Sequence, residues 1–370
     1  MRWTLLPLSA LVAATLITRV GAAPTKAPTW DAAAAARYLD SRMDWWREWP
    51  KADRDHGTKC ISCHTSLPHT LARPSLRLQL GQSKASVSEM AMFDDVVKRV
   101  YMWKEVEPFY PDQARGAPKS SESRGVEGVL NALVLATRDK ERGYLGSDTR
   151  QAFDNMWALQ MQGGDLKGGF IWLNFKLEPF ESSTATYWGA TLAALAVARA
   201  PGGYAADPKI AANVEALRAY LRTGLIGSLY TRTLILWADS CLHGILDAGQ
   251  RQKIIEDIAA AQRADGGWSL TSISTWKRID GSNLPEESDG YATAAITLAL
   301  RESGVPISAG PLKAARAWLA AHQDKETGAV PAKSVNKDRQ KGTDAYLFMT
   351  DEATGMAALA MGPGTGAASD

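Results

Sequence analysis

The apolar positions of this chain recur in helical runs, and the runs themselves repeat along the sequence. Six comparable segments rich in small and apolar residues close at leucines 51 to 60 residues apart, namely Leu80, Leu135, Leu195, Leu246, Leu300 and Leu359. Each unit is interpreted as a helix, a loop and a second helix rich in Ala, Leu and Thr. Patterns typical of strands are scarce. The sequence therefore predicts an all-α protein built from helical hairpins.

The two helices of each hairpin differ in pattern. Ala-rich apolar faces allow the close packing that the inner helices of a closed ring need. We predict such inner helices at 125–136, 184–198, 289–300 and 352–361. The amphipathic segments 211–221 and 250–261 predict outer helices, which bury one stripe only.

The loops between the two helices repeat as well. One reads Q-R-A-D-G-G-W over 262–268, a second begins at Gln160 and contains Gly163-Gly164 and Gly168-Gly169, and a decayed copy covers 323–329. The glycines permit tight turns. We expect each Gln to bond backbone groups of the next unit, and each aromatic residue to pack between units.

These loops, each followed by an acidic residue and a Thr-rich apolar helix, resemble the repeat of the terpene cyclase and prenyltransferase family, including squalene–hopene cyclase-like proteins. The resemblance covers roughly 84–362 and implies an (α/α)6 toroid with a central cavity. It does not extend to the D-x-D-D protonation motif of squalene–hopene cyclases, because the nearest acidic run, 280–289, ends in E-E-S-D and is arranged differently. Carbocation cyclisation needs a strong, positioned acid, so we expect no such activity.

Asp239 and Cys241 match half of the zinc pattern of protein prenyltransferases, and a zinc site with a distant His322 is one alternative. The other makes Asp239 a helix cap and Cys241 a core residue. Acidic residues recur near the expected starts of inner helices, where they are predicted to cap the helix or stabilise its positive end: Glu122, Glu181, Asp239, Asp289 and Asp351.

One segment has a pattern of its own. Residues 60–64 read C-I-S-C-H, the attachment pattern of c-type haem. Two thiols one turn apart can each add to a vinyl group of one porphyrin, and His64 then supplies the proximal imidazole. A zinc site would need a second pair of ligands, and a thioredoxin-like redox pair would need a βαβ context. A lone disulfide would leave His64 unexplained. We predict one covalent haem c on Cys60 and Cys63, with His64 as iron ligand.

The ligand opposite His64 is left open. The candidates are His56, His69, His243, Met43, Met90 and Met92. Met or His in that place would make an electron-transfer centre, whereas an open face would bind a small ligand or support oxidation. Arg73 and Arg77 are expected either to pair with haem propionates or to be solvated surface charges.

The N-terminus predicts export. Residues 1–22 have the layout of a secretory signal peptide, with an uncleaved anchor as the alternative. No later apolar run approaches about 18 residues, so no stable membrane insertion is expected. The predicted divisions are a signal peptide (1–22), a haem-binding first repeat (23–83), toroid repeats (84–362) and a flexible tail (363–370). The protein is expected to be periplasmic or otherwise exported.

The amino-acid composition reduces the number of function classes that fit this chain. The chain is 45% hydrophobic with a net charge of +2, and we expect no nucleic-acid partner because no basic patch is evident. Three cysteines do not make a disulfide framework. The leading hypothesis is a monohaem c-type cytochrome that transfers electrons to a redox partner protein or oxidises a ligand in the cavity. The alternatives are an enzyme acting on an isoprenoid-like substrate with a structural haem, and a non-enzymatic protein that binds a hydrophobic small molecule or a partner.

Overall fold

The computed structural model describes residues 29–363 of the 370-residue chain. The predicted signal peptide (1–22) and all but the first residue of the predicted tail (363–370) lie outside the described residues. Helices dominate the described part. Its named strands are β1 (Asp53–Arg54) and β2 (Thr58–Lys59), which pair as one short antiparallel hairpin.

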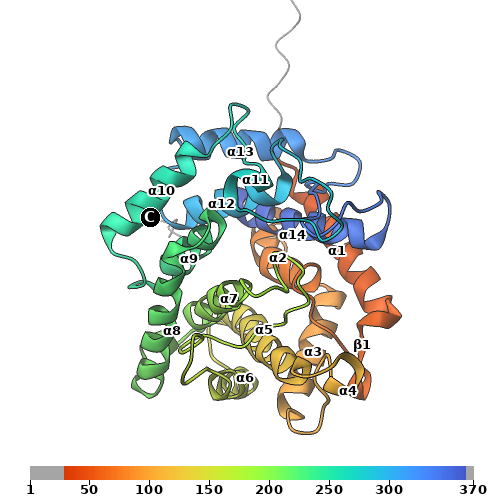
Figure 1. Ribbon diagram of the computed structural model, residues 1–370. Helices are drawn as coiled ribbons and strands as arrows, with labels where there is room; N and C mark the ends of the chain where they lie inside the picture. The colour runs from red at the N-terminus through yellow and green to blue at the C-terminus, as the bar shows by residue number, and fades with distance from the viewer. Residues whose placement is uncertain (1–28, 364–370) are drawn as a thin grey trace, which may run out of the picture.

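Within residues 29–363, six inner helices surround a common centre (Figure 1). Each packs against the next along the chain, and the last packs against the first, which closes the ring. They are α2 (Ser66–Leu80), α5 (Lys119–Arg142), α7 (Thr186–Arg199), α9 (Leu229–Leu242), α12 (Gly290–Glu302) and α14 (Asp344–Met361). The predicted all-α toroid is therefore confirmed.

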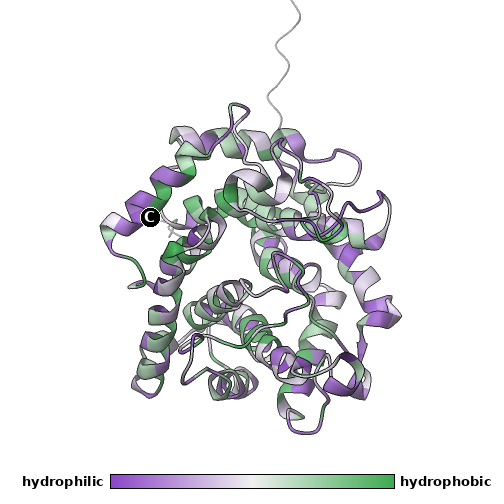
Figure 2. Ribbon diagram, in the orientation of Figure 1, coloured by the Kyte–Doolittle hydropathy of each residue, from purple (hydrophilic) through white to green (hydrophobic). Residues whose placement is uncertain are grey.

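The outer helices lie around this ring (Figure 1). They are α1 (Ala32–Glu48), α3 (Val87–Tyr101), α6 (Ser147–Ala158), α8 (Ala211–Thr223), α10 (Ala248–Ala260) and α13 (Gly310–His322), with the short helices α4 (Asp112–Arg115) and α11 (Leu270–Ile273) in loops. Helix α10 buries only Ile254 and Ile258, whereas most of α7 is buried. Figure 2 shows the resulting contrast, with hydrophilic residues prominent on outer helices such as α10.

The repeated glutamines join neighbouring units. Gln262 follows α10, and its Nε2 donates to Gly266 O of its own loop (2.8 Å) and to Pro311 O at the start of α13 (2.9 Å). Gln160 does the same with Gly168 O and Asn213 O. These contacts fix each loop against the next outer helix.

Gln323 closes the ring in the same way. Its Nε2 donates to Gly328 O (3.0 Å) and to Asp31 O (2.9 Å), and its Oε1 accepts from the backbone N–H of Asp31 (2.8 Å). Asp31 is the N-cap of α1, so the decayed third copy of the loop ties the last unit to the first. Gly328 has a φ of 81°, and a Cβ there would lie 2.3 Å from the carbonyl carbon of Ala34. Only glycine allows this approach.

Several expected positions need correction. Helix α14 begins at Asp344, before the predicted 352, and α9 ends before Leu246. Asp239 therefore lies in the last turn of α9 and Asp351 within α14, so neither is an N-cap. The repeat period places helices in register but carries little information on where each one ends.

Other acidic positions agree with the prediction. Asp289 is the N-cap of α12, where its Oδ1 accepts from the backbone N–H groups of Tyr291 and Ala292. Glu122 lies in the first turn of α5. Between residues 29 and 363, no helix is both long and apolar enough to cross a membrane.

Candidate functional site

The C-x-x-C-H segment occupies the loop between α1 and α2, the position at which other units carry their Gln and Gly residues. The β1–β2 hairpin leads into it, and the N–H of Cys60 donates to Ala52 O (2.8 Å). The indole Nε1 of Trp46, near the end of α1, donates to the carbonyl of Cys60 (2.7 Å). A buried tryptophan thus fixes the start of the motif.

Ser62 fixes the end of the motif by bonding the backbone at the start of α2. Its Oγ accepts from the backbone N–H groups of Thr65 and Ser66, each at 3.0 Å. Its own N–H donates to Ser66 Oγ (2.7 Å). Cys63 and His64 therefore lie in the turn just before an inner helix, where the Ser62 hydroxyl satisfies two backbone N–H groups that have no partner within the helix.

Both motif thiols are buried and free, and none of the three cysteines, all within the described residues, forms a disulfide. Burial raises the pKa of Cys60 to about 11 and the pKa of Cys63 well above its usual value. The two thiols are therefore protonated at neutral pH, and neither has the activated thiolate of a redox-reactive cysteine.

The ring of His64 lies between aromatic side chains. Phe348 of α14 stacks on it with centroids 3.8 Å apart, and Trp46 meets it edge-on at 5.3 Å. Burial lowers the pKa of His64 to about 3, so the imidazole is neutral at pH 7, the form that binds a metal.

A hydrogen-bond chain sets which nitrogen of His64 carries its proton. The hydroxyl of Thr65 donates to Asp351 Oδ2 (2.8 Å), and Thr65 Oγ1 is itself 3.0 Å from His64 Nδ1. Because the Thr65 proton is already used, its oxygen accepts from Nδ1–H. The lone pair is left on Nε2, the nitrogen that an iron ligand needs.

The surroundings of this loop fit a covalently attached haem in their chemistry. Two free thiols three residues apart stand beside a neutral imidazole. Trp45, Trp49 and Phe348 are only partly buried and form one aromatic cluster with Trp46 and His64. Aromatic faces with some exposure suit the flat, apolar surface of a porphyrin.

Arg73 and Arg77 both lie on α2 and are buried in ion pairs. Arg73 Nε is 3.1 Å from Asp40, and Arg77 Nη2 is 2.6 Å from Glu141; Arg77 also bonds Glu89. They are not the solvated surface charges of the second alternative. Their pairing with propionates stays a prediction, but each arginine already has a carboxylate partner.

The candidates for the distal ligand are scattered. His69 bonds Asp40 through Nε2 (3.0 Å), and its buried Nδ1 has no hydrogen-bond partner among the described residues. Met92 accepts from the hydroxyl of Thr70 (3.1 Å). Met43 is core, whereas Met90 is exposed and His56 pairs with Asp55. None of these interactions is with His64, so the distal ligand stays open.

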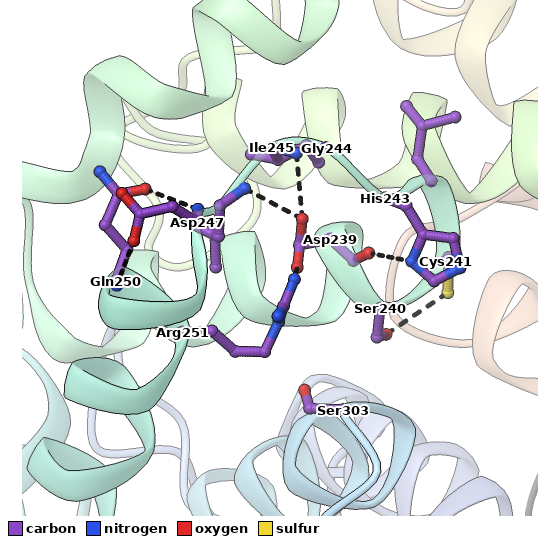
Figure 3. A network of polar contacts seen from close by, with 12 residues as sticks. Asp239, Ser240, Cys241, His243, Gly244, Ile245, Asp247, Gln250, Arg251 and Ser303 are labelled. Atoms are coloured by element: carbon purple, nitrogen blue, oxygen red, sulfur yellow. Dashed lines mark hydrogen bonds and ion pairs between the residues drawn. The ribbon is translucent and has the colours of Figure 1, made fainter.

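The region of Asp239, Cys241 and His243 has a structural role (Figure 3). Asp239 accepts from the backbone N–H groups of Ile245 and Leu246 (3.0 Å each) and from Arg251 Nη2 (2.6 Å). It thereby holds the chain that leaves α9, and His243 Nδ1 bonds the carbonyl of Asp239.

The zinc alternative is not supported by this geometry. His322 stacks on Trp318, with centroids 3.8 Å apart, and bonds its carbonyl. In the part of the chain that the structure describes, no three His, Cys, Asp or Glu side chains are grouped so that they could hold a metal ion.

The resemblance implied a cavity in the ring, but neither its position nor a second buried feature was anticipated. A cavity of about 690 Å³ lies at the carboxyl-terminal ends of the inner helices. In the middle of α14, Glu352 is 2% exposed and its Oε2 has no hydrogen-bond partner among residues 29–363; burial raises its pKa well above the usual value. Both features are formed by residues of several units, so no local sequence signal marks them.

Comparison with known proteins shows the fold. No family model matches the chain, and no curated protein matches it in sequence. The unsaturated glucuronyl hydrolase of Bacillus sp. GL1 aligns over 88% of this chain and 95% of its own, at 13% identity and a TM-score of 0.52. At this identity the likeness establishes a shared helical toroid and nothing about activity.

Two terpene cyclases align less closely. The ent-copalyl diphosphate synthase from Streptomyces platensis covers 82% of this chain at 18% identity and a TM-score of 0.45, and the alignment covers 52% of that enzyme. This chain therefore spans about half the length of the synthase. The type II terpene cyclase MstE from Scytonema covers 90% of this chain, with 99% of its own length aligned, at 12% identity and a TM-score of 0.45.

Proposed function

We propose that this protein is an exported c-type cytochrome with one haem, built on a helical toroid, and that its function is redox. One observation carries the proposal: Cys60, Cys63 and His64 share the loop that leads directly into inner helix α2, with both thiols free. Cys60 and Cys63 would hold the haem covalently, and His64 would be its proximal ligand. When bound, the haem supplies a one-electron redox centre.

The residues around the motif would hold it in a geometry suited to haem binding. Trp46 and Ser62 hold the backbone of the loop at its two ends, so the thiols and the imidazole have a fixed spacing. Thr65 and Asp351 orient the imidazole through Nδ1. An oriented and neutral histidine binds a metal with less reorganisation than a solvated one.

The position of the loop favours electron transfer over a purely structural haem. Trp45, Trp49 and Phe348 are partly exposed beside the motif, so a redox partner protein could approach this end of the ring. Aromatic residues with some exposure are also common at protein interfaces. Oxidation of a ligand is the second form of the proposal and depends on an open distal face.

The first test is an optical spectrum of the mature protein from a host that matures c-type cytochromes. We expect covalent haem in the wild type, its loss in the Cys60→Ala/Cys63→Ala double variant, and its retention in Cys241→Ala, the matched control. Wild-type protein without covalent haem would refute the proposal. A low-spin spectrum that carbon monoxide leaves unchanged would establish two protein ligands and electron transfer. A high-spin spectrum that shifts with carbon monoxide would establish an open iron and favour ligand oxidation.

A further inference from the structure

The cavity of about 690 Å³ lies at the end of the ring opposite the C-x-x-C-H loop. It is lined mainly by the second halves of the six inner helices, together with Leu71 from the second turn of α2, whereas the loop precedes the first turn of α2. Its volume is within the range of about 300–1,000 Å³ typical of small-molecule sites. Lys140, which contributes to the lining, is exposed, so the cavity is open to solvent at this end.

The inner wall of the cavity is apolar. Leu71, Leu298 and Leu359 line it from three different helices, and Trp237 adds an aromatic surface. Leu71, Trp237 and Leu298 are buried. A ligand in this space would therefore lose apolar surface to the protein, which is the main driving force for binding in such sites.

The rim of the cavity has an excess of positive charge. Its lining includes Lys140, Arg199 and Arg301 together with two glutamates. Both glutamates are paired with arginines, Glu141 with Arg77 and Glu302 with Arg301. Arg301 also donates to the backbone carbonyls of Leu359 and Gly362.

Arg199 is the cation whose hydrogen bonds are incomplete. Its Nη1 is buried and has no hydrogen-bond partner within residues 29–363. Burial lowers the pKa of both Arg199 and Lys140. A cation in the last turn of a helix interacts favourably with the helix dipole. The dipole does not, however, supply a hydrogen-bond acceptor for a buried N–H group. An anion in the cavity would supply one.

We propose that this cavity binds an amphipathic anion, namely a single apolar chain that ends in a carboxylate. The carboxylate would lie at the rim against Arg199 and Lys140, and the chain would extend along Leu71, Leu298 and Trp237. A guanidinium binds a carboxylate through two parallel hydrogen bonds, which fits an incompletely bonded arginine. The apolar wall excludes a wholly polar anion. The site does not involve the haem and is tested independently of it.

The test titrates the mature protein with oleate and follows tryptophan fluorescence and heat of binding. Oleyl alcohol has the same chain without the charge, and acetate has the charge without the chain. We expect oleate to bind with a stoichiometry of one, oleyl alcohol to bind about ten-fold more weakly or worse, and acetate not to bind. Equal binding of oleate and oleyl alcohol, or no binding of oleate, would overturn the proposal.

Variants locate the site. Arg199→Met should weaken oleate about 10- to 100-fold and leave oleyl alcohol unchanged, because only the charged hydrogen bonds are lost. Lys313→Met, an exposed cation on α13, is the matched control and should bind as the wild type does. Leu298→Trp should block both probes by filling the cavity.

A chemical readout gives a second, independent measurement. Cys241 lines the cavity and is partly exposed, so bound oleate should slow its alkylation while acetate does not. The inference is refuted if the Arg199→Met variant binds oleate with wild-type affinity. It is also refuted if oleate leaves the rate of Cys241 alkylation unchanged, because any binding would then be elsewhere. None of these readouts uses the haem, so failure here leaves the proposed redox function standing, and the converse also holds.

Discussion

The closure of the ring depends on Gln323, and its replacement by alanine tests this directly. Gln323 makes three hydrogen bonds at the junction of the last and first units, two across it with Asp31 and one within its own loop with Gly328. A buried hydrogen bond contributes about 0.5–1.5 kcal/mol net, so Gln323→Ala should lower the free energy of unfolding by about 2–4 kcal/mol. Urea titration followed by circular dichroism measures this change.

The equivalent glutamines of other units should show losses of stability that follow the number of hydrogen bonds each one makes. Gln160 also makes three bonds of this kind, and Gln160→Ala should cost about as much. Gln262→Ala should cost less, because Pro311 has no N–H to donate to the Gln262 side chain. Gln252→Ala, on the exposed face of α10, is the control and should cost no more than about 0.5 kcal/mol. If Gln323→Ala costs no more than Gln252→Ala, the ring is not held by this junction.

Three further predictions concern stability. Gly328→Ala should lower the melting temperature of the protein far more than Gly342→Ala does. Both glycines have a positive φ, but only at Gly328 would an added Cβ meet a backbone within 4 Å. Equal shifts of the melting temperature would contradict this. Asp239→Ala should lower the free energy of unfolding by about 3–5 kcal/mol, because it leaves Arg251 and two backbone N–H groups unpaired. A chelator should leave the melting temperature of the wild type unchanged. A melting temperature that falls with chelator would contradict the structural role of Asp239. Burial raises the pKa of Glu181 from 4.5 to about 7, so the folded protein holds this proton more tightly and stability falls as pH rises between these values. Glu181→Gln should match the wild type in Tm below pH 4.5 and exceed it above pH 7, and a constant difference across this range would contradict the assignment.

The fold was predictable because its signals are local and repeated. The loops that begin at Gln160, Gln262 and Gln323 each combine a glutamine with a glycine further along the same loop. Each glutamine makes the same two contacts to carbonyl groups, one in its own loop and one in the next unit. The chemistry of the C-x-x-C-H motif is equally local, because five consecutive residues contain it. The ends of helices were less predictable, and Asp239 and Asp351 were placed near helix starts because the apolar pattern does not show where a helix begins.

Other features depend on residues that the sequence keeps far apart. Phe348 meets His64 only because α14 packs against α2, and Thr65 finds Asp351 for the same reason. Arg73 and Arg77 were expected either at a haem or in solvent, whereas packing of α2 against its neighbours placed both in buried ion pairs.

The sequence by itself determined the secondary structure class, the repeat, the junctions between units and the C-x-x-C-H spacing of the motif, because each of these follows from residues within one turn or one loop. Tertiary structure decided the protonation and orientation of His64, the aromatic cluster beside it, and the cavity with its incompletely bonded Arg199. Burial and partners set these properties. In a closed ring both come from helices of several units, and no local pattern of residues records which helices will meet.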